Sequence, residues 1–182
     1  MDRRAAKTRN ALVDAMVALV KLRGFDALKL SEILAEAGVG RSTFYGHYEG
    51  KDAFLVSSFV DMIARTDQVE VQHFGMDAVG LLPTAPLLHH VSEYREFAVS
   101  LAQSAAFDAT MAAGEEKLRA VALHRLARKY PAMSPEERSR AAVFAASAFI
   151  GLVRWWIRRG VDADWQQLDA QFTRMIESGL TA

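Results

Sequence analysis

The stretch GFDALKLSEILAEAGVGRSTFYGHYEGKDAFL, Gly24 to Leu55, contains two short helical patterns separated by glycines. The first pattern covers Leu30 to Ala37. Ser31 stands where its hydroxyl can accept a hydrogen bond from a free N–H of the first turn, so we expect it to cap this helix. Gly38-Val39-Gly40 then interrupts the pattern, and a second short helix is predicted over 41–48. Two short helices joined by such a turn form a helix-turn-helix.

The second helix of this pair has an outer face suited to DNA. Phe44 and Tyr48 are four residues apart and are expected to face the core. The outward and flanking positions then carry small, hydroxylated or phenolic side chains: Ser42, Thr43, Tyr45 and Gly46. Hydroxyls donate hydrogen bonds to phosphates, and Arg41 in the first turn can read guanine O6 and N7 with two bonds. The pattern indicates a helix for the major groove, although ordinary surface helices and enzymes also contain helix-turn-helix geometry.

The charge distribution favours an anionic partner at one end of the chain. The 182 residues carry 22 Lys and Arg against 22 Asp and Glu, so the net charge is zero. Residues 1–51 nevertheless hold nine basic and six acidic residues, whereas residues 52–182 hold 13 and 16. A basic first quarter on an acidic body is typical of a chain that meets a polyanion with that part alone. The basic residues that can serve as an arm along the same DNA strand are Arg3, Arg4, Lys7 and Arg9.

Residues Gly24 to Leu55 resemble the DNA-binding domain of the TetR (tetracycline repressor) family, and residues 8–24 fit that family's first helix. The matching positions are Ile33, Ala37-Gly38-Val39, Thr43-Phe44-Tyr45, His47-Tyr48, Lys51 and Leu55. The resemblance implies an all-α homodimer with three N-terminal DNA-binding helices and a larger helical domain. It divides the chain into a DNA-binding domain, 1–50, and an effector-binding and dimerisation domain, 51–182, which begins with a linker helix over 51–68.

The resemblance also implies which side chains meet DNA. By motif position they are Arg41, Ser42, Thr43, Tyr45, His47 and Lys51. Thr43, Tyr45 and Lys51 match positions that bind phosphates. Arg41 and Ser42 are favoured for base edges.

At three positions in this region the expected DNA contact is uncertain or missing from the family pattern. His47 has an alternative role, in which its ring packs against the first helix and is hydrogen-bonded there. Gly40 stands where the family usually has a Ser or Thr that caps the recognition helix, so a phosphate-contacting hydroxyl is missing. Leu30 stands near the position where a Thr often begins the second helix. These departures concern individual contacts and not the fold.

Helical spacing dominates the rest of the chain. Helices are predicted over residues 12–23, 51–68, 87–101, 107–113, 118–130, 135–160 and 165–178, with a strand-like or helical piece at 69–74. Ser134 and Glu137 form a capping box with Pro135 between them, which is a strong start signal. Asp162 or Asp164 is expected to cap the last helix and Gly179 to end it. With about nine helices and no convincing strand, the predicted class is all-α.

The helix predicted over 135–160 is apolar nearly all round in its middle. Ala141 to Ile157 contains only Ser147 and Arg154 as polar residues and is shorter than the roughly 20 residues of a membrane span, so a buried helix of a soluble protein is expected. Such a helix needs cover on several sides, which a second copy can supply. The predicted dimer interface is Ala145, Ala148, Gly151, Trp165, Leu168 and Phe172. A two-fold dimer would hold two recognition helices about 34 Å apart, to match a palindrome.

An effector pocket is expected between the linker helix and the helices near 87–103, 115–130 and 135–160. The candidate lining residues are aromatic or Met: Met62, Tyr94, Phe97, Phe107, Met111, Phe144 and Trp155. Ordinary core packing is the alternative for each of them, and for Trp155 packing at the dimer interface is favoured. Such a lining suits a small apolar or aromatic molecule.

Several classes of function are excluded or disfavoured. The chain has no Cys, so disulfides, thiolate metal sites and a Cys nucleophile are excluded. His89 and His90 are adjacent and diverge on a helix, His124 is distant, and no HxxxH or HExxH spacing occurs, so no metal is expected. No nucleophile elbow or phosphate-binding glycine loop is present, so neither an enzyme nor a cofactor is predicted. Without an apolar run of signal-peptide length, a cytoplasmic protein with no membrane anchor is predicted.

The predicted function is a dimeric transcriptional regulator, with a repressor favoured. It would bind a palindromic operator in double-stranded DNA and respond to a small-molecule effector in its C-terminal domain. The alternative is a helical dimer that binds a ligand or a protein and has lost specific DNA binding.

Overall fold

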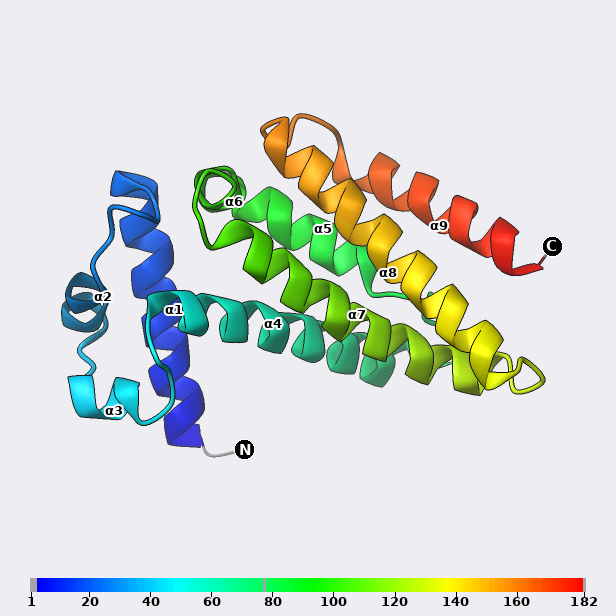
Figure 1. Cartoon of the computed structure of the whole chain (residues 1–182), viewed down its shortest axis with the longest axis horizontal. Helices are drawn as coiled ribbons and strands as arrows, with labels where there is room; N and C mark the ends of the chain where they lie inside the picture. Colours follow the sequence, from blue (N-terminus) through cyan, green and yellow to red (C-terminus); the bar gives the residue numbers. More distant parts are fainter. Residues whose placement is uncertain (1–2, 77, 182) are drawn as a thin grey trace.

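The computed structural model describes residues 3–76 and 78–181, which form nine helices and no strand. They are α1 Arg3–Arg23, α2 Leu30–Ala37, α3 Arg41–Tyr45, α4 Lys51–Phe74, α5 Thr84–Glu93, α6 Arg95–Leu101, α7 Phe107–Lys129, α8 Pro135–Arg158 and α9 Trp165–Thr181. The predicted all-α class is confirmed. Figure 1 shows α1, α2 and α3 together at one end of an elongated molecule, and α4 leading from them into a bundle of the remaining helices.

The bounds of α2 match the prediction, but the expected cap is wrong. Ser31 lies inside the helix, and the N-cap is Lys29. The backbone N–H of Lys29 donates to the carboxylate of Glu32 at 2.9 Å, and this hydrogen bond is the main reason that the pKa of Glu32 is lowered. Gly38 ends the helix with a φ of 64°, a left-handed conformation that favours glycine.

A cluster of aromatic rings fastens α3 to the protein. Phe44 is only 1% exposed, and the centroid of its ring lies 5.3 Å from that of Tyr48 and 5.9 Å from that of Phe54 on α4. The inward position of Phe44 is confirmed. The helix ends at Tyr45, earlier than the predicted 48, because Gly46 follows and favours helix propagation poorly.

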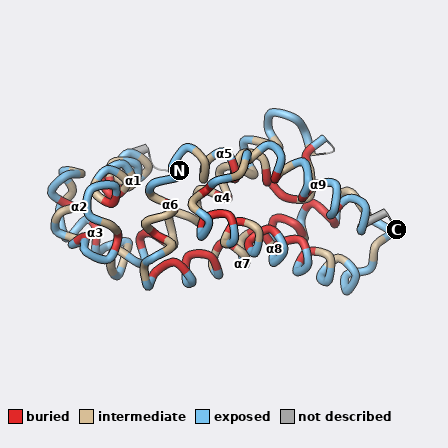
Figure 2. Tube along the Cα trace, turned by 90° about the horizontal axis from the view of Figure 1, so that it is seen from above, coloured by how far each residue is buried: buried red, intermediate tan, exposed pale blue. Residues whose placement is uncertain are grey.

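α7 is the centre of the C-terminal bundle. α4 packs along it, α8 packs along it as well, and α5 packs against α9. Buried residues follow α7 and α8 in Figure 2. α8 is long and apolar enough by composition to cross a membrane, but one of its faces is buried in the bundle: Ala142, Ala145, Ala146, Phe149, Ile150, Val153, Trp156 and Ile157.

α4 and α7 are longer than predicted, as is α1, which begins at Arg3 and not near residue 12. The piece at 69–74 is the last part of α4. The predicted end near Gly114 is wrong, since α7 continues through it to Lys129. A Cβ on Gly114 would lie 2.3 Å from Cε1 of Phe59 on α4. This glycine therefore serves the close packing of α4 on α7 and does not end a helix.

Other boundaries differ in smaller ways. The helix predicted over 87–101 is two helices, α5 and α6, which meet at Tyr94 with φ −103° and ψ 33°. Gly179 does not end α9, which runs to Thr181. The capping box at Ser134 is confirmed, since its N–H donates to Glu137 at 2.7 Å and its hydroxyl accepts from the N–H of Glu137 at 3.2 Å. Asp164 accepts from the N–H of Gln166 at 3.0 Å at the start of α9.

A buried ionic cluster ties α4 to α7. Arg125 is fully buried, and its guanidinium donates to Asp67 at 2.7 and 3.0 Å and to Glu70 at 2.7 Å, both on α4. The same guanidinium donates to the carbonyl oxygen of Gly80 at 2.8 Å, in the loop after α4. Lys129 donates to the carbonyl oxygen of Val79 in this loop. The cluster thus holds both the last turns of α4 and the connection to α5.

We expect Arg125→Met to lower the free energy of unfolding by about 3–5 kcal/mol, because it leaves two partly buried carboxylates without their partner. Arg119→Met on the same helix is the matched control. Arg119 pairs with Glu116 on the surface at 2.6 Å, and loss of such a pair costs less than about 1 kcal/mol. Urea denaturation of both variants measures the difference, and equal effects would contradict a structural role for the cluster.

Candidate DNA-binding surface and effector cavity

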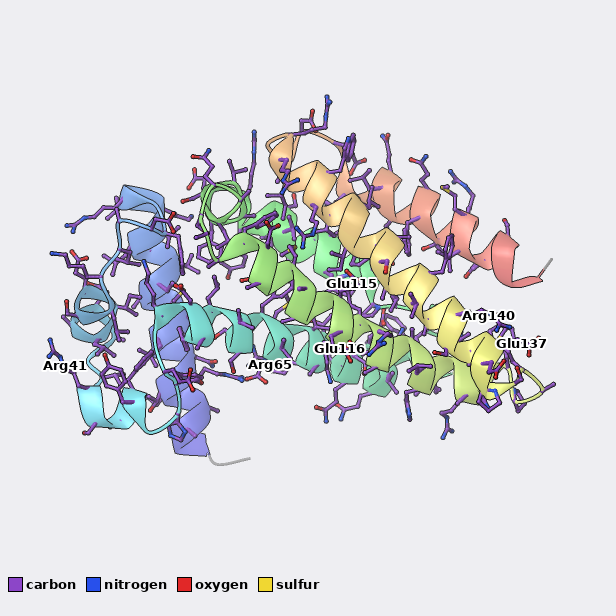
Figure 3. All side chains as sticks on the ribbon, viewed as in Figure 1. Arg41, Arg65, Glu115, Glu116, Glu137 and Arg140 are labelled. Atoms are coloured by element: carbon purple, nitrogen blue, oxygen red, sulfur yellow. The ribbon has the colours of Figure 1, made fainter. Side chains whose placement is uncertain are left out.

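The face of α3 that the sequence assigns to DNA is exposed. The side chains of Arg41, Ser42, Thr43, Tyr45 and His47 are all solvent-exposed, and Tyr45 is 59% exposed despite its aromatic ring. Figure 3 shows Arg41 at the start of α3, pointing away from the rest of the molecule. Because Phe44 anchors the opposite side of this short helix, the exposed face has a fixed orientation.

His47 stands at the edge of a hollow behind α3. This hollow of about 450 Å³ lies between α1, α3 and α4, and its lining includes Thr43, His47 and the ion pair of Arg9 with Asp61. The His47 ring lies 6.2 Å from that of Tyr48. Arg9 is predicted to belong to an arm along the DNA. In the structure it lies on α1 and pairs with Asp61 of α4.

Lys51 has a different environment from the other predicted contacts. Its ammonium donates to the carbonyl oxygens of Phe25 at 2.8 Å, Asp26 at 3.2 Å and Leu28 at 2.8 Å. It also lies 4.6 Å from the centroid of the Phe25 ring. Lys51, the first residue of α4, thus holds the turn between α1 and α2. A phosphate contact would have to compete with these three acceptors, which the sequence pattern does not reveal.

The residues predicted for the dimer interface separate into two groups. Ala145, Leu168 and Phe172 are buried inside the protomer, because they face the core between α8 and its neighbours. Ala148 and Gly151 are exposed on α8, and Trp165 is partly buried beside the ring of His89.

The exposed face of α8 is apolar along much of its length. Phe144 is 67% exposed, Trp155 48% and Val143 44%, and they share the outer side of α8 with Ala148 and Gly151. Met175 on α9 is 68% exposed. Val143 and Met175 are absent from the predicted set, although the spacing of Val143 with Ala148 and Gly151 on one helical face would have indicated it.

One hollow of the size of a small-molecule site lies partly where the effector pocket is predicted, along α4, α5 and α6. This hollow of about 440 Å³ is bounded by α1, α4, α5 and α6, and not by α7 and α8. Of the predicted lining residues, Met62, Tyr94 and Phe97 lie in it. Phe107 and Met111 are 2% exposed and belong to the core, whereas Phe144 and Trp155 lie on the outer face of α8. The α1 residues Val13 and Val17 were missed, because sequence does not reveal that α1 reaches this cavity.

The adjacent His89 and His90 have different surroundings. His89 faces Glu93 at 3.6 Å and the ring of Trp165, whereas the His90 ring lies 4.5 Å from that of Tyr94 in the cavity wall. Burial lowers the pKa of His90, which favours its neutral form. Within residues 3–76 and 78–181, no group of three or more His, Cys, Asp or Glu side chains is placed to hold a metal ion.

Two family models match the chain. The model of bacterial regulatory proteins of the tetR family matches residues 12–57, and a model of a transcriptional regulator C-terminal region matches residues 84–178. The chain belongs to the TetR family. TetR-family proteins are DNA-binding transcriptional regulators with a helix-turn-helix, and the matched residues include α2 and α3 of this chain.

Several solved structures of transcriptional regulators share the fold over nearly the whole chain. The dihydroxyacetone kinase operon activator DhaS has a TM-score of 0.73 at 17% identity, with 96% of each chain covered. The transcriptional repressor FadR of Thermus thermophilus, in complex with lauroyl-CoA, has a TM-score of 0.67 at 17% identity, with 94% of each chain covered. The repressor AlkX of Dietzia has a TM-score of 0.66 at 19% identity, with 94% of this chain and 96% of the AlkX chain covered. A comparison with curated proteins found none that matches.

We expect Lys51→Met to act mainly on stability. It leaves three carbonyl oxygens of the turn between α1 and α2 without a charged donor, at a cost of about 2 kcal/mol. DNA binding should depend on salt almost as in the wild type. The slope of the logarithm of the binding constant against the logarithm of the salt concentration should change by less than about one, which is the change expected when one phosphate contact is lost. Thermal unfolding and DNA titrations at several salt concentrations measure both effects.

Lys29→Met, in the same turn, is the control, because the side chain of Lys29 is exposed. A Lys51 variant that unfolds like the wild type but loses a full unit of salt slope would show that Lys51 binds phosphate instead.

Proposed function

We propose that this chain is a dimeric, effector-responsive transcriptional regulator that binds operator DNA through α3. The observation that carries the proposal is the exposed outer face of α3, with Arg41, Ser42, Thr43 and Tyr45 on a helix anchored from behind by Phe44. Arg41 and Ser42 read base edges, and Thr43, Tyr45 and His47 hold phosphates. Lys51 supports this surface from the turn behind it.

The homodimer forms through the outer face of α8 and the neighbouring part of α9. A monomeric soluble protein rarely exposes a row of large apolar side chains, so the row of Val143, Phe144 and Trp155 favours a covered surface. Ala148 and Gly151 between them allow a second α8 to approach closely. A two-fold axis through this face would present two α3 helices to a palindromic operator.

The operator is read by residues 1–50, and the effector site lies mainly in residues 51–182, with α1 forming one of its walls. A small apolar molecule in the cavity of about 440 Å³ would change the positions of the two α3 helices. Repression is the proposed direction, in agreement with the similar repressors FadR and AlkX, whereas the similar DhaS is an activator. The protein acts in the cytoplasm and catalyses no reaction.

Selection of bound duplexes from a random DNA pool tests DNA recognition. We expect a palindromic consensus whose half-sites are one helical turn apart, or a multiple of that. Arg41→Ala should weaken binding to the selected operator by about 1–3 kcal/mol and affect random duplex less, because a base contact is lost. Arg128→Ala, an exposed arginine on α7, is the control.

Two outcomes would count against this assignment. Equal losses of Arg41→Ala on operator and random duplex would exclude Arg41 as a base reader. No enrichment at low salt, from a folded dimer, would favour a helical dimer that has lost specific DNA binding.

We expect Phe144→Asp to weaken dimerisation by about 2 kcal/mol or more, because it puts a charge at the centre of an apolar interface. Sedimentation velocity over a range of concentrations measures the equilibrium. Leu22→Asp is the matched control, since Leu22 on α1 is 77% exposed and lies outside the proposed interface. A Phe144→Asp variant that dimerises like the control would place the interface on another surface.

A further inference from the structure

A groove separates α4 from α5. α4 packs closely on α7 but makes few contacts with α5. Two hollows follow each other along this gap, one of about 440 Å³ next to α1 and one of about 510 Å³ towards the end of α4. Arg65 lines both. The groove is therefore elongated, with a cation at the junction of its two parts.

The hollow next to α1 has mainly apolar walls. Val13 and Val17 of α1, Phe59 and Met62 of α4, and Phe97 of α6 form much of its surface. Its volume falls within the range of small-molecule sites, about 300–1,000 Å³. These walls fit an aliphatic chain.

One buried polar atom beside this hollow has no hydrogen-bond partner among the described residues. The hydroxyl oxygen of Ser58 is buried and makes no hydrogen bond with any residue that the structure describes. Ser58 stands in the lining between Leu55 and Met62. Buried hydroxyls without a partner are rare in native proteins, so this one points to a ligand atom that can accept or donate a hydrogen bond.

The groove carries charges of both signs: Asp14 on α1 and Glu70 on α4 are acidic, and Lys21 on α1 and Arg65 on α4 are basic. Within the described part of the chain, Arg65 has no ion pair or hydrogen-bond partner, whereas Lys21 at the other end of the hollow faces Glu96 at 3.5 Å. Glu70, which lines the outer hollow, is held by Arg125 at 2.7 Å. Figure 3 shows Arg65 part-way along α4. An anionic group is the partner that this free guanidinium favours.

We propose that the groove binds a linear aliphatic carboxylate whose chain carries a hydroxyl or keto oxygen. The carboxylate pairs with Arg65, the chain fills the hollow next to α1, and Ser58 hydrogen-bonds the oxygen on the chain. Ser58 and Arg65 are seven residues apart on α4, which is about 10 Å along the helix axis. The inference rests on the proposed effector-responsive function and names the class of effector.

The position of the groove explains how such a ligand would reach the DNA-binding surface. α1 forms one wall of the hollow, and α2 packs against α1. A ligand that binds more tightly when α1 moves away from α4 shifts the protein towards that arrangement, and α3 moves with it. The ligand therefore contacts the DNA-binding part of the chain directly, through Val13 and Val17.

Calorimetric titration of the DNA-free protein tests the site. The probes are dodecanoate, dodecanol, lauroyl-CoA and a series of monohydroxydodecanoates with the hydroxyl at successive carbons. We expect at least one hydroxydodecanoate to bind more tightly than dodecanoate, and dodecanol to bind weakly. Arg65→Met should weaken carboxylate binding about 10- to 100-fold and leave dodecanol unchanged. Arg65→Lys should restore part of the loss, and Arg128→Met should have no effect.

Ser58→Ala tests the second contact. It should remove the preference for the hydroxylated chain while dodecanoate binds as well as before or better, because the unpartnered hydroxyl is gone. Unchanged carboxylate binding in Arg65→Met, with circular dichroism showing a folded protein, would overturn the proposal. The proposal would also be overturned if lauroyl-CoA binds and none of the free acids does.

The DNA experiment is separate from this one. Carboxylate binding that depends on Arg65 in a protein with no selected operator would leave the site standing and remove the regulatory function. A selected operator together with no carboxylate binding would overturn the carboxylate site and leave the regulatory function standing.

Discussion

The burial of Arg125 against Asp67 and Glu70 is the constraint on which the arrangement of the molecule depends. A buried guanidinium is costly unless every donor is satisfied, and here two carboxylates and the carbonyl oxygen of Gly80 satisfy it. The partners lie on α4 and on the loop after it, so the second half of α4 is held on α7. The first half of α4 projects from this fixed point and carries the DNA-binding end of the chain.

α4 connects the functions because each part of it meets a different element. Lys51 holds the turn between α1 and α2, and Phe54 supports Phe44 beneath α3. Further along, Ser58 and Arg65 line the groove that separates α4 from α5. A small rotation of the first turns of α4, before the contact of Phe59 with Gly114, would move α3 and change the groove next to α1 together. Ligand binding and DNA binding would then be coupled through one rigid element.

Local patterns predicted the helix-turn-helix well because its determinants lie close in sequence. The turn at Gly38 needs a left-handed residue, and the spacing of Phe44 and Tyr48 sets which side of α3 is exposed. The start of α8 at Ser134 depends on two hydrogen bonds within four residues. The error at Gly114 has a distant cause, because this residue looks like a helix end but makes room for Phe59 on α4.

The sequence by itself determined the all-α class, the family, the outward face of α3 and the capped start of α8, because helical periodicity and capping are local. Only the tertiary structure decided where the cavity lies, that Lys51 meets backbone carbonyls, and that Ala145, Leu168 and Phe172 face the core while Phe144 faces outward. Periodicity identifies an apolar face of a helix but not what covers it. The choice among core, cavity and dimer surface depends on how α1, α4 and α8 pack on their neighbours.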